Sequence, residues 1–527
     1  MRKLSAVRSQ LSTQAGARRG VDSRPATLPA PTKGWFSLAP VANAPPDSAF
    51  RLINWFPQPG WVEIRKGHIE HVDTGSGLPV ETLAAYQGVS SRELYAWSGA
   101  NIYDVTLGAP STVVTGLGSA RAQFINFATT GGNFLYSVNG VDDPQIYNGS
   151  AWTVPVITGI TASDIIGINS HKNRLWFVLT GSSAAAYLPV DSIQGAASTF
   201  ELGGLWSMGG FLMAIGTWSI DAGNGPDDYI VFVSSRGQVA IYSGTDPGDA
   251  DNWSLVGVFN MGAPIGRRCL TQVGADLAII CVDGVVPLSR AMIFERAAVQ
   301  KVALTENIQP DMNEAARVWK DNFGWQLVSY PRGTRAILNV PQVENDTQVQ
   351  FVMNTIHGAW CVFEGMNANC WELLNDRLYF GGNDGVVYLA DEGGGDPVEI
   401  LRADMMTAFN YFNLRGMLKH WTMCQPVITT DQSVNPGIAF NVDFRTDAPI
   451  TVPTTTPLGA SLWDVALWDV GTWAPGEVTQ ANWTSVTGLG YCASIRYVVD
   501  ILPTSVDDVT LRVNAFNLVM QKGAFVG

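Results

Sequence analysis

The sequence predicts an all-β protein: a β-propeller of about seven blades, followed by a C-terminal β-sandwich-like domain and preceded by an extended N-terminal arm. Its 54 glycines and 28 prolines in 527 residues are typical of many short strands joined by tight turns. Hydrophobic residues make up 46% and aromatic residues 10%, enough to build a packed core. A loose repeat of strands and turns extends from about residue 81 to about residue 395. At about 40–45 residues per four-stranded blade, this stretch accommodates about seven blades, and six to eight are compatible with it.

Each repeat consists of an apolar run, a tight turn and a second apolar run. The turns carry Ser-Gly, Asn-Gly, Asp-Gly or Arg-Gly pairs, which supply the positive φ angles that short hairpins need. Aromatic residues recur at the strand ends, a placement that suits blades stacked around an axis. A series of unrelated hairpins in two sandwiches is the alternative. The repeats occupy residues 93–106, 133–152, 173–190, 229–253, 276–289 and 376–394.

Charge and composition divide the chain into a basic arm (1–45), the propeller (46–397) and a C-terminal β domain (398–527) that forms a ring or interface. The first 33 residues contain seven basic side chains and one acid, a net charge of +6. Because the whole chain carries −14, the remainder carries −20. We expect the arm to contact a partner rather than to act as a targeting peptide or to be simply disordered. The expected contact residues are Arg2, Lys3, Arg8, Arg18 and Arg19.

Two segments need a secondary-structure assignment of their own. Residues 202–220 contain no charge, and their length is close to the ~20 residues of a membrane helix. Glycines interrupt this segment, and its aromatic and β-branched residues favour buried strands, so we expect no stable membrane span. Residues 306–322 predict a helix, because Pro310 lies near its start and apolar residues follow at helical spacing.

The C-terminal domain contains a repeated Leu-Trp-Asp-Val motif. Trp463, Trp468 and Trp473 follow one another at a spacing of five residues and alternate with aspartates. This arrangement suits packing at an edge strand or a subunit interface, where aromatic residues are enriched. A platform for a sugar ligand is the alternative interpretation.

The sequence lacks the motifs that mark common active sites. It has no G-x-S-x-G elbow, no phosphate-binding P-loop and no H-E-x-x-H pair. His68 and His71 would point to opposite faces of a strand and could not share a metal ion. Asp246, Asp249 and Asp251 lack the spacing of a calcium loop, so we expect a turn in which they cap the backbone. We therefore predict no catalytic residues, no cofactor and no metal site, and buried reduced thiols for the six cysteines.

Several long stretches resemble a known family. They comprise residues 54–75, 124–152, 171–178, 187–259 and 266–289. Together they resemble the tail nozzle or hub proteins of short-tailed double-stranded DNA bacteriophages, also described as packaged-DNA-stabilising proteins. The likeness extends over about residues 50–475.

The resemblance implies a virion structural protein that is not an enzyme. Such proteins form a ring, usually a hexamer, below the portal and its adaptor. The ring extends the DNA channel, retains the packaged DNA and lets it pass on ejection. The implied partners are further copies of the chain, the portal and adaptor proteins, tail fibres or spikes, and DNA in transit without sequence-specific binding. The implied location is the virion tail, assembled in the host cytoplasm.

The charge distribution agrees with this interpretation. An acidic surface facing a channel would repel phosphates and let DNA slide, whereas stable DNA binding needs lysine and arginine. The alternative is that the acidic residues only keep the protein soluble. At the level of function, the alternative is a carbohydrate-binding or glycan-cleaving propeller used in host-surface recognition. That function would need convergent carboxylates, or an arginine cluster for an acidic sugar.

Overall fold

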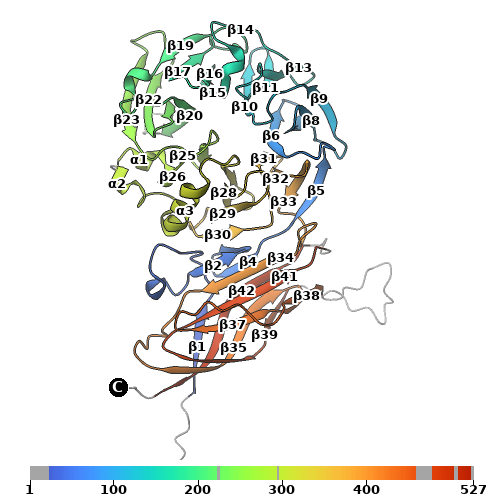
Figure 1. Ribbon diagram of the computed structural model, residues 1–527, viewed down its shortest axis with the longest axis vertical. Coiled ribbons are helices and arrows are strands. Elements are labelled where there is room, and N and C mark those ends of the chain that lie inside the picture. Colours follow the sequence, from blue (N-terminus) through green and yellow to red (C-terminus); the bar gives the residue numbers. More distant parts are fainter. Residues whose placement is uncertain (1–22, 222–225, 294–295, 458–476, 504–507, 524–527) are drawn as a thin grey trace, which may run out of the picture.

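The computed structural model describes residues 23–221, 226–293, 296–457, 477–503 and 508–523. A circle of short sheets forms one part of the molecule, and a stack of longer strands forms the other (Figure 1). The predicted all-β fold with a propeller is confirmed.

Six blades of the propeller are sheets of their own. Five are four-stranded and one is three-stranded. The first two contain β6 (Val80–Gln87), β7 (Arg92–Ser98), β8 (Asn101–Asp104) and β9 (Ser111–Thr115), then β10 (Gln123–Thr129), β11 (Gly132–Val138), β12 (Gln145–Tyr147) and β13 (Trp152–Thr153). The next three contain β15 (Ile165–His171), β16 (Arg174–Leu179), β17 (Ala184–Tyr187) and β19 (Ser198–Glu201), then β20 (Leu212–Asp221), β21 (Pro226–Ser234), β22 (Gln238–Gly244) and β23 (Trp253–Asn260), then β24 (Leu270–Val273), β25 (Asp276–Cys281) and β26 (Gly284–Pro287).

The last blade closes the circle with a strand from the beginning of the propeller sequence. It contains β31 (Cys370–Leu374), β32 (Arg377–Gly381), β33 (Val386–Ala390) and β5 (His68–Asp73). Strand β5 pairs antiparallel with β33, with Val386 opposite Asp73 and Ala390 opposite His68. The two ends of the propeller sequence are therefore held together by backbone hydrogen bonds.

A shared sheet occupies the remaining position in the circle. It is eight-stranded, and its first half is β27 (Gln326–Tyr330), β28 (Arg335–Pro341), β29 (Gln348–Asn354) and β30 (Trp360–Phe363). Strand β27 contacts β24 on one side and β31 on the other, as an inner blade strand does. Its second half is β2 (Ala49–Ile53), β34 (Leu401–Thr407), β41 (Ala493–Ile501) and β37 (Gly437–Val442). Six blades are separate sheets, and the first half of the shared sheet occupies one further position in the circle. The number of blades therefore lies within the predicted range of six to eight.

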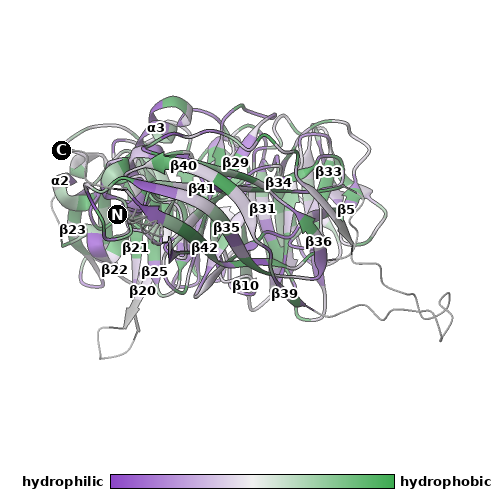
Figure 2. Ribbon diagram, turned by 90° about the horizontal axis from the view of Figure 1, so that it is seen from below, coloured by the Kyte–Doolittle hydropathy of each residue, from purple (hydrophilic) through white to green (hydrophobic). Residues whose placement is uncertain are grey.

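The long strands form another sheet, which covers the second half of the shared sheet (β2, β34, β41 and β37). It contains β3 (Trp55–Gln58), β4 (Trp61–Ile64), β42 (Leu511–Lys522), β35 (Lys419–Thr430), β39 (Val478–Ala481), β1 (Ser23–Pro29) and β40 (Thr484–Gly490). Strands β35 and β42 pair over their whole length and lie side by side in Figure 2. The aromatic ring of Tyr497 in β41 contacts that of Phe516 in β42, so the two sheets pack face to face as a sandwich.

Both ends of the chain build this sandwich. The proposed boundaries placed residues 1–45 in an arm and began the propeller at residue 46. In the structure β1 pairs with β42, β2 pairs with β34, and β4 pairs with β42, whereas the first propeller strand is β5. The region that follows the propeller is thus completed by residues 23–64. Pairing between strands more than 350 residues apart leaves no local signal in the sequence.

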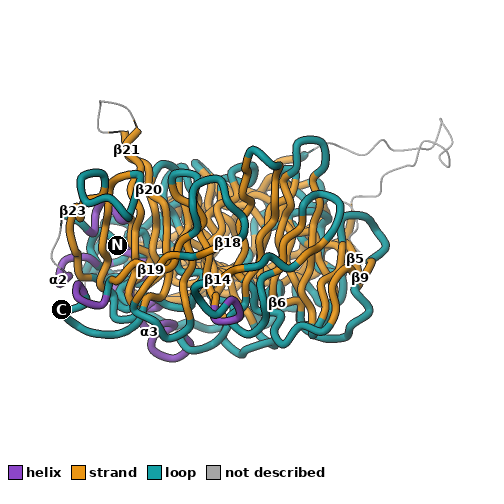
Figure 3. Tube along the Cα trace, turned by 90° about the horizontal axis from the view of Figure 1, so that it is seen from above, coloured by secondary structure: helices purple, strands orange, loops and turns teal. Residues whose placement is uncertain are grey.

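The remaining elements are short. They are β14 (Ile157–Thr158), β18 (Gly195–Ala196), β36 (Gln432–Asn435), β38 (Thr454–Pro457), α1 (Leu288–Ala291), α2 (Arg296–Val299), α3 (Gln309–Trp319), and the 3-10 turns η1 (Val41–Asn43), η2 (Ala162–Asp164), η3 (Gly203–Leu205) and η4 (Glu306–Ile308). The predicted helix at 306–322 corresponds to η4 and α3, with Pro310 in the first turn. The uncharged segment 202–220 leads into β20, whose hairpin with β21 projects from the ring of blades (Figure 3).

Local predictions about side chains also hold. Asp246 and Asp249 accept hydrogen bonds from the backbone amides of Gly248 and Asp251, as expected for a capped turn. The indole of Trp253 stacks on that of Trp176 at a centroid distance of 5.6 Å. All six cysteines are buried.

A buried ion pair ties the propeller closure to the sandwich. Arg65, between β4 and β5, is 1% exposed and forms two hydrogen bonds to Asp396, of 2.9 and 2.6 Å. Its other donors bond to the side-chain oxygen of Asn54 and to the carbonyls of Lys66 and Glu364. Burial opposes the ionisation of Asp396, but Arg65 and a hydrogen bond from His68 lower the pKa of that carboxyl below its ordinary value.

We predict that Asp396→Ala lowers the free energy of unfolding by about 3–5 kcal/mol, because it leaves the Arg65 guanidinium buried without its anion. Urea denaturation at neutral pH measures the change. Asp47→Ala is the control: it breaks the exposed Lys33–Asp47 pair, whose two groups lie 3.1 Å apart, and is expected to cost less than about 1 kcal/mol. Equal losses in the two variants would contradict the role of the buried pair.

Candidate functional site

A hollow lies at the axis of the propeller. It has a volume of about 480 Å³, and residues of the inner strands β6, β10, β15, β20, β24, β27 and β31 line it. These strands contact one another around the circle, so the cavity is enclosed laterally by backbone. Ligands of β-propellers and barrels commonly bind in such openings, which makes this cavity the first candidate site.

Arg268 spans the cavity near the starts of the inner strands. It precedes β24, yet its Nη2 donates hydrogen bonds to the carbonyls of Glu81 and Ala122 and to the hydroxyl of Thr82, at 3.0, 3.1 and 2.8 Å. Those residues belong to β6 and to the segment before β10, which are not neighbours of β24 in the circle. The side chain therefore links blades across the axis.

Phe323 and Arg121 extend this crossbar. The Phe323 ring lies between the two guanidinium groups, 5.1 Å from that of Arg268 and 4.4 Å from that of Arg121. Arg121 is paired with Glu81 at 2.9 Å and with Glu344 at 2.6 Å. Of these three residues Arg268 lines the cavity, and its guanidinium is stacked against Phe323.

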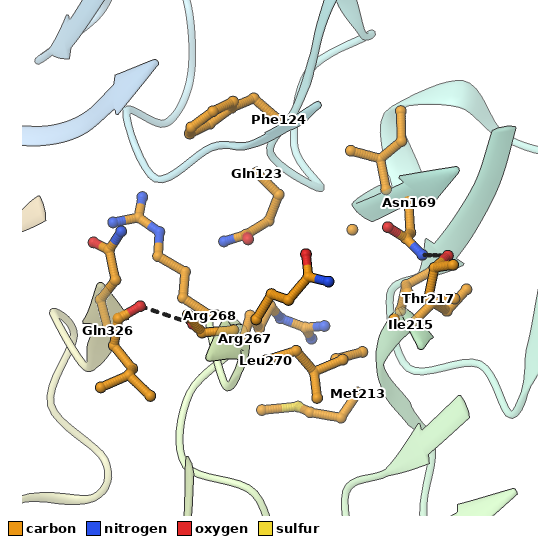
Figure 4. A pocket seen from close by; sticks show the side chains of 18 of the residues that line it. Gln123, Phe124, Asn169, Met213, Ile215, Thr217, Arg267, Arg268, Leu270 and Gln326 are labelled. Carbon is orange, nitrogen blue, oxygen red and sulfur yellow. Dashed lines mark hydrogen bonds between the residues drawn. The ribbon is translucent and has the colours of Figure 1, made fainter. Parts of the chain in front are cut away.

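Arg267 differs from Arg268, because its guanidinium forms no hydrogen bond with another described residue. Figure 4 shows its side chain extending to the opposite side of the cavity from that of Arg268. The guanidinium lies 6.0 Å from the Phe211 ring, and its Nη1 is buried without a hydrogen-bond partner among the described residues. Burial lowers the pKa of this guanidinium, although an arginine stays charged at any ordinary pH.

Uncharged polar side chains complete the wall. The side-chain amide of Gln326 pairs with the backbone of Trp371. It donates to the Trp371 carbonyl at 2.9 Å and accepts from the Trp371 amide at 3.0 Å. Asn169 donates to the hydroxyl of Thr217 at 3.0 Å. Gln123 and Gln272 also line the cavity, and their amides make no side-chain hydrogen bond within the described part of the chain. Two amides and one guanidinium are therefore available to a ligand.

Acidic residues do not line this cavity within the described ranges. The pair of carboxylates that glycan cleavage would need is thus missing from it. Glu372 of β31 lies close behind the wall, and burial raises the pKa of its carboxyl to about 8, although the Leu373 amide and Arg268 oppose the shift. Among the described residues no group of three or more His, Cys, Asp or Glu side chains could hold a metal ion.

The predicted contact residues fall outside the described part of the structure. These are Arg2, Lys3, Arg8, Arg18 and Arg19 of the arm, and Trp463, Trp468 and Trp473 of the C-terminal domain. Arg267 and Arg268 were not predicted from the sequence as site residues. An arginine doublet directly before a strand of a strongly acidic chain was the available signal, but only the fold shows that it reaches the axis.

The two free edges of the long-stranded sheet form a second candidate site. At one edge, β1 bonds to β42 through its even-numbered residues, as the hydrogen bond from the Ala30 amide to the Asn514 carbonyl indicates. Pro25 and Pro29 consequently occupy positions that face away from the sheet. Proline has no amide hydrogen and blocks pairing with a further strand there.

The opposite edge has no such protection. Strands β39 and β40 each pair only with β35 within the described residues. Val478, Trp483, Leu489 and Tyr491 on or beside these strands are 37%, 47%, 60% and 42% exposed. An unpaired edge with exposed apolar side chains is a typical site of association with another chain. We call residues 478–491 the open edge.

We predict that Glu372 makes the protein less stable as the pH rises. The folded chain keeps the proton on this carboxyl up to a pKa of about 8, whereas the unfolded chain releases it near 4.5, so the free energy of unfolding falls between these values. Glu372→Gln removes this fall. At pH 9 the free energy of unfolding of the variant should exceed that of the wild type by up to about 5 kcal/mol, and at pH 4 the two values should be similar.

Urea denaturation across this pH range tests the prediction, with the exposed Glu399→Gln as the control. A wild-type minus Glu372→Gln difference that does not change with pH would show that this carboxyl is not held protonated.

No family model matches the sequence, and none of the curated proteins matches it either. Structural similarity extends to several solved structures at low identity. The BBS1N chain of its complex with ARL6DN shares 11% identity over 62% of this chain and 98% of its own, with a TM-score of 0.39. Sqt1 of Saccharomyces cerevisiae shares 12% over 62% and 98%, with a TM-score of 0.33. The extracellular domain of the hybrid two component system BT3049 of B. thetaiotaomicron shares 10% over 72% and 56%, with a TM-score of 0.40.

Proposed function

We propose that this chain is a structural subunit of a bacteriophage tail nozzle, which assembles with further copies of itself into a ring around the DNA path. The observation that carries the proposal is the contrast between the two edges of the long-stranded sheet. One edge is blocked by prolines, whereas the open edge exposes apolar side chains, and its outer strands have no further pairing partner among the described residues. The resemblance to tail nozzle and hub proteins is the independent support.

The contrast between the edges favours a ring over a simple twofold dimer. If the open edge met its own copy, association would end at two subunits. An open edge that contacts a different surface of the next copy gives a heterologous interface, which can close into a ring. A hexamer is the number that the resemblance implies, with the portal and adaptor above and tail fibres or spikes at the periphery.

The axial cavity argues for a DNA path between subunits. Arg268 crosses the axis, and the side chains around the cavity leave about 480 Å³. A duplex therefore has no route through the propeller of one chain. In the proposed assembly the DNA passes through the centre of the ring, where an acidic surface would repel phosphates.

The proposed subunit acts without bond chemistry. The axial cavity lacks lining carboxylates in the described ranges, so its geometry does not favour the alternative of a glycan-cleaving propeller. Among the described residues no helix is long and apolar enough to cross a membrane.

We predict that the full-length protein forms annular particles and that Leu489→Glu weakens their assembly at least tenfold, since it places a charge on the open edge. Mass photometry and negative-stain electron microscopy of the purified chain, alone and with a portal–adaptor complex, measure both effects. Leu107→Glu, at a 77% exposed position on the propeller, is the matched control. A protein that stays monomeric in both settings, or a loss of assembly equal in the two variants, would contradict the proposal.

A further inference from the structure

The axial cavity contains a half-buried guanidinium, that of Arg267, without a carboxylate partner among the described residues. Buried or half-buried guanidinium groups elsewhere in the described chain have carboxylate partners: Arg65 is paired with Asp396, Arg335 with Asp391, and Arg496 with Asp404. The Arg267 guanidinium lies beside the Phe211 ring, and its Nη1 is buried without a hydrogen-bond acceptor among the described residues. Leaving such a charge uncompensated is costly, so a missing anion is the simplest completion of the site.

The surroundings of Arg267 are those of a binding site for an anion. The cavity is lined by two arginines and by no acidic residue of the described chain, although the whole protein carries a net charge of −14. Gln123 and Gln272 add side-chain amides that have no hydrogen-bond partner among the described residues. Figure 4 shows Gln123 on the wall opposite the arginine pair, facing the same space.

We propose that the axial cavity binds a small oxyanion, a phosphate or a carboxylate, through the guanidinium of Arg267. The planar fork of an arginine matches two oxygens of either group, and both groups are recognised by this shared chemistry. Gln123 and Gln272 bind further polar atoms of the ligand. The proposal does not depend on assembly, because every residue in it comes from one propeller.

The size of the cavity limits what can bind. About 480 Å³ accommodates a small molecule of the kind that protein pockets usually bind. Arg268 crosses the same space. The cavity is consequently too small for a DNA duplex, and the ligand is a free anion or a small molecule that carries one.

Titration of the full-length protein with inorganic phosphate and, separately, with glucuronate tests the proposal. Isothermal titration calorimetry gives the affinity, and the unfolding midpoint gives the stabilisation by the ligand. We expect saturable binding of at least one probe with a Kd of about 1 mM or tighter. Phosphate alone would identify a phosphate site, and glucuronate alone would identify a carboxylate site.

Arg267→Met is the informative variant, since it keeps the bulk of the side chain and removes the charge. We expect its affinity for the bound probe to fall at least tenfold, while its midpoint in anion-free buffer stays equal to or above that of the wild type, because the unpaired charge is gone. Arg236→Met removes an exposed arginine and should leave both properties unchanged.

Three results would overturn the inference. They are saturable binding of neither probe up to about 10 mM, ten times the expected Kd; equal binding by wild type and Arg267→Met; and equal losses of binding in Arg267→Met and Arg236→Met. Because the anion-free midpoint reports folding, a misfolded Arg267→Met protein is recognised by its lowered stability and replaced by Arg267→Gln. The outcome is also distinguishable from failure of ring assembly, which changes particle mass and not phosphate affinity.

Discussion

Closure of the propeller is the constraint on which the other features depend. Strand β5 must leave the sandwich, cross to β33 and complete the last blade. Arg65 lies directly before that strand and binds Asp396, which lies directly after β33 on the way back to the sandwich. The two crossings between the halves of the molecule are thus joined by one buried ion pair. The close approach leaves no room for a side chain at Gly67, where a Cβ atom would collide with the Gly395 carbonyl.

The propeller then determines what the axis can do. Blades packed in a circle bring the starts of their inner strands together, so residues that are remote in sequence meet in one small space. Arg268 uses that meeting to brace the circle through its hydrogen bonds to the first two blades and its contact with Phe323. Arg267 enters the same space from the segment before β24, and its Nη1 has no hydrogen-bond partner among the described residues. The brace and the proposed anion site are therefore two products of one arginine doublet.

The blades were predictable from the sequence because each one is a local structure. The hairpins at 93–106 and 376–394 appear as β7–β8 and β32–β33, with their turns at the Gly-containing pairs. The helix at 306–322 was equally local. Pairing of β1 with β42 and of β2 with β34 was not predictable, because the partners are hundreds of residues apart and either end of the chain reads simply as strand. The same reason hid the axial cavity: Arg267 looks like any surface arginine until the circle closes around it.

The eight-stranded sheet has a mechanical consequence. Strand β2 pairs with β30 of the propeller on one side and with β34 of the sandwich on the other, so hydrogen bonds run without interruption from one half of the molecule to the other. Two domains joined by a linker can rotate relative to each other. Two parts that share one sheet can change their relative orientation only by bending that sheet. A pull on the far end of the sandwich would load the β2–β34 pairs and the single β2–β30 bridge, at which Ile53 lies opposite Val362. The propeller and the sandwich would therefore move as one stiff body. A tilt of the sandwich in a larger particle would tilt the propeller by the same angle.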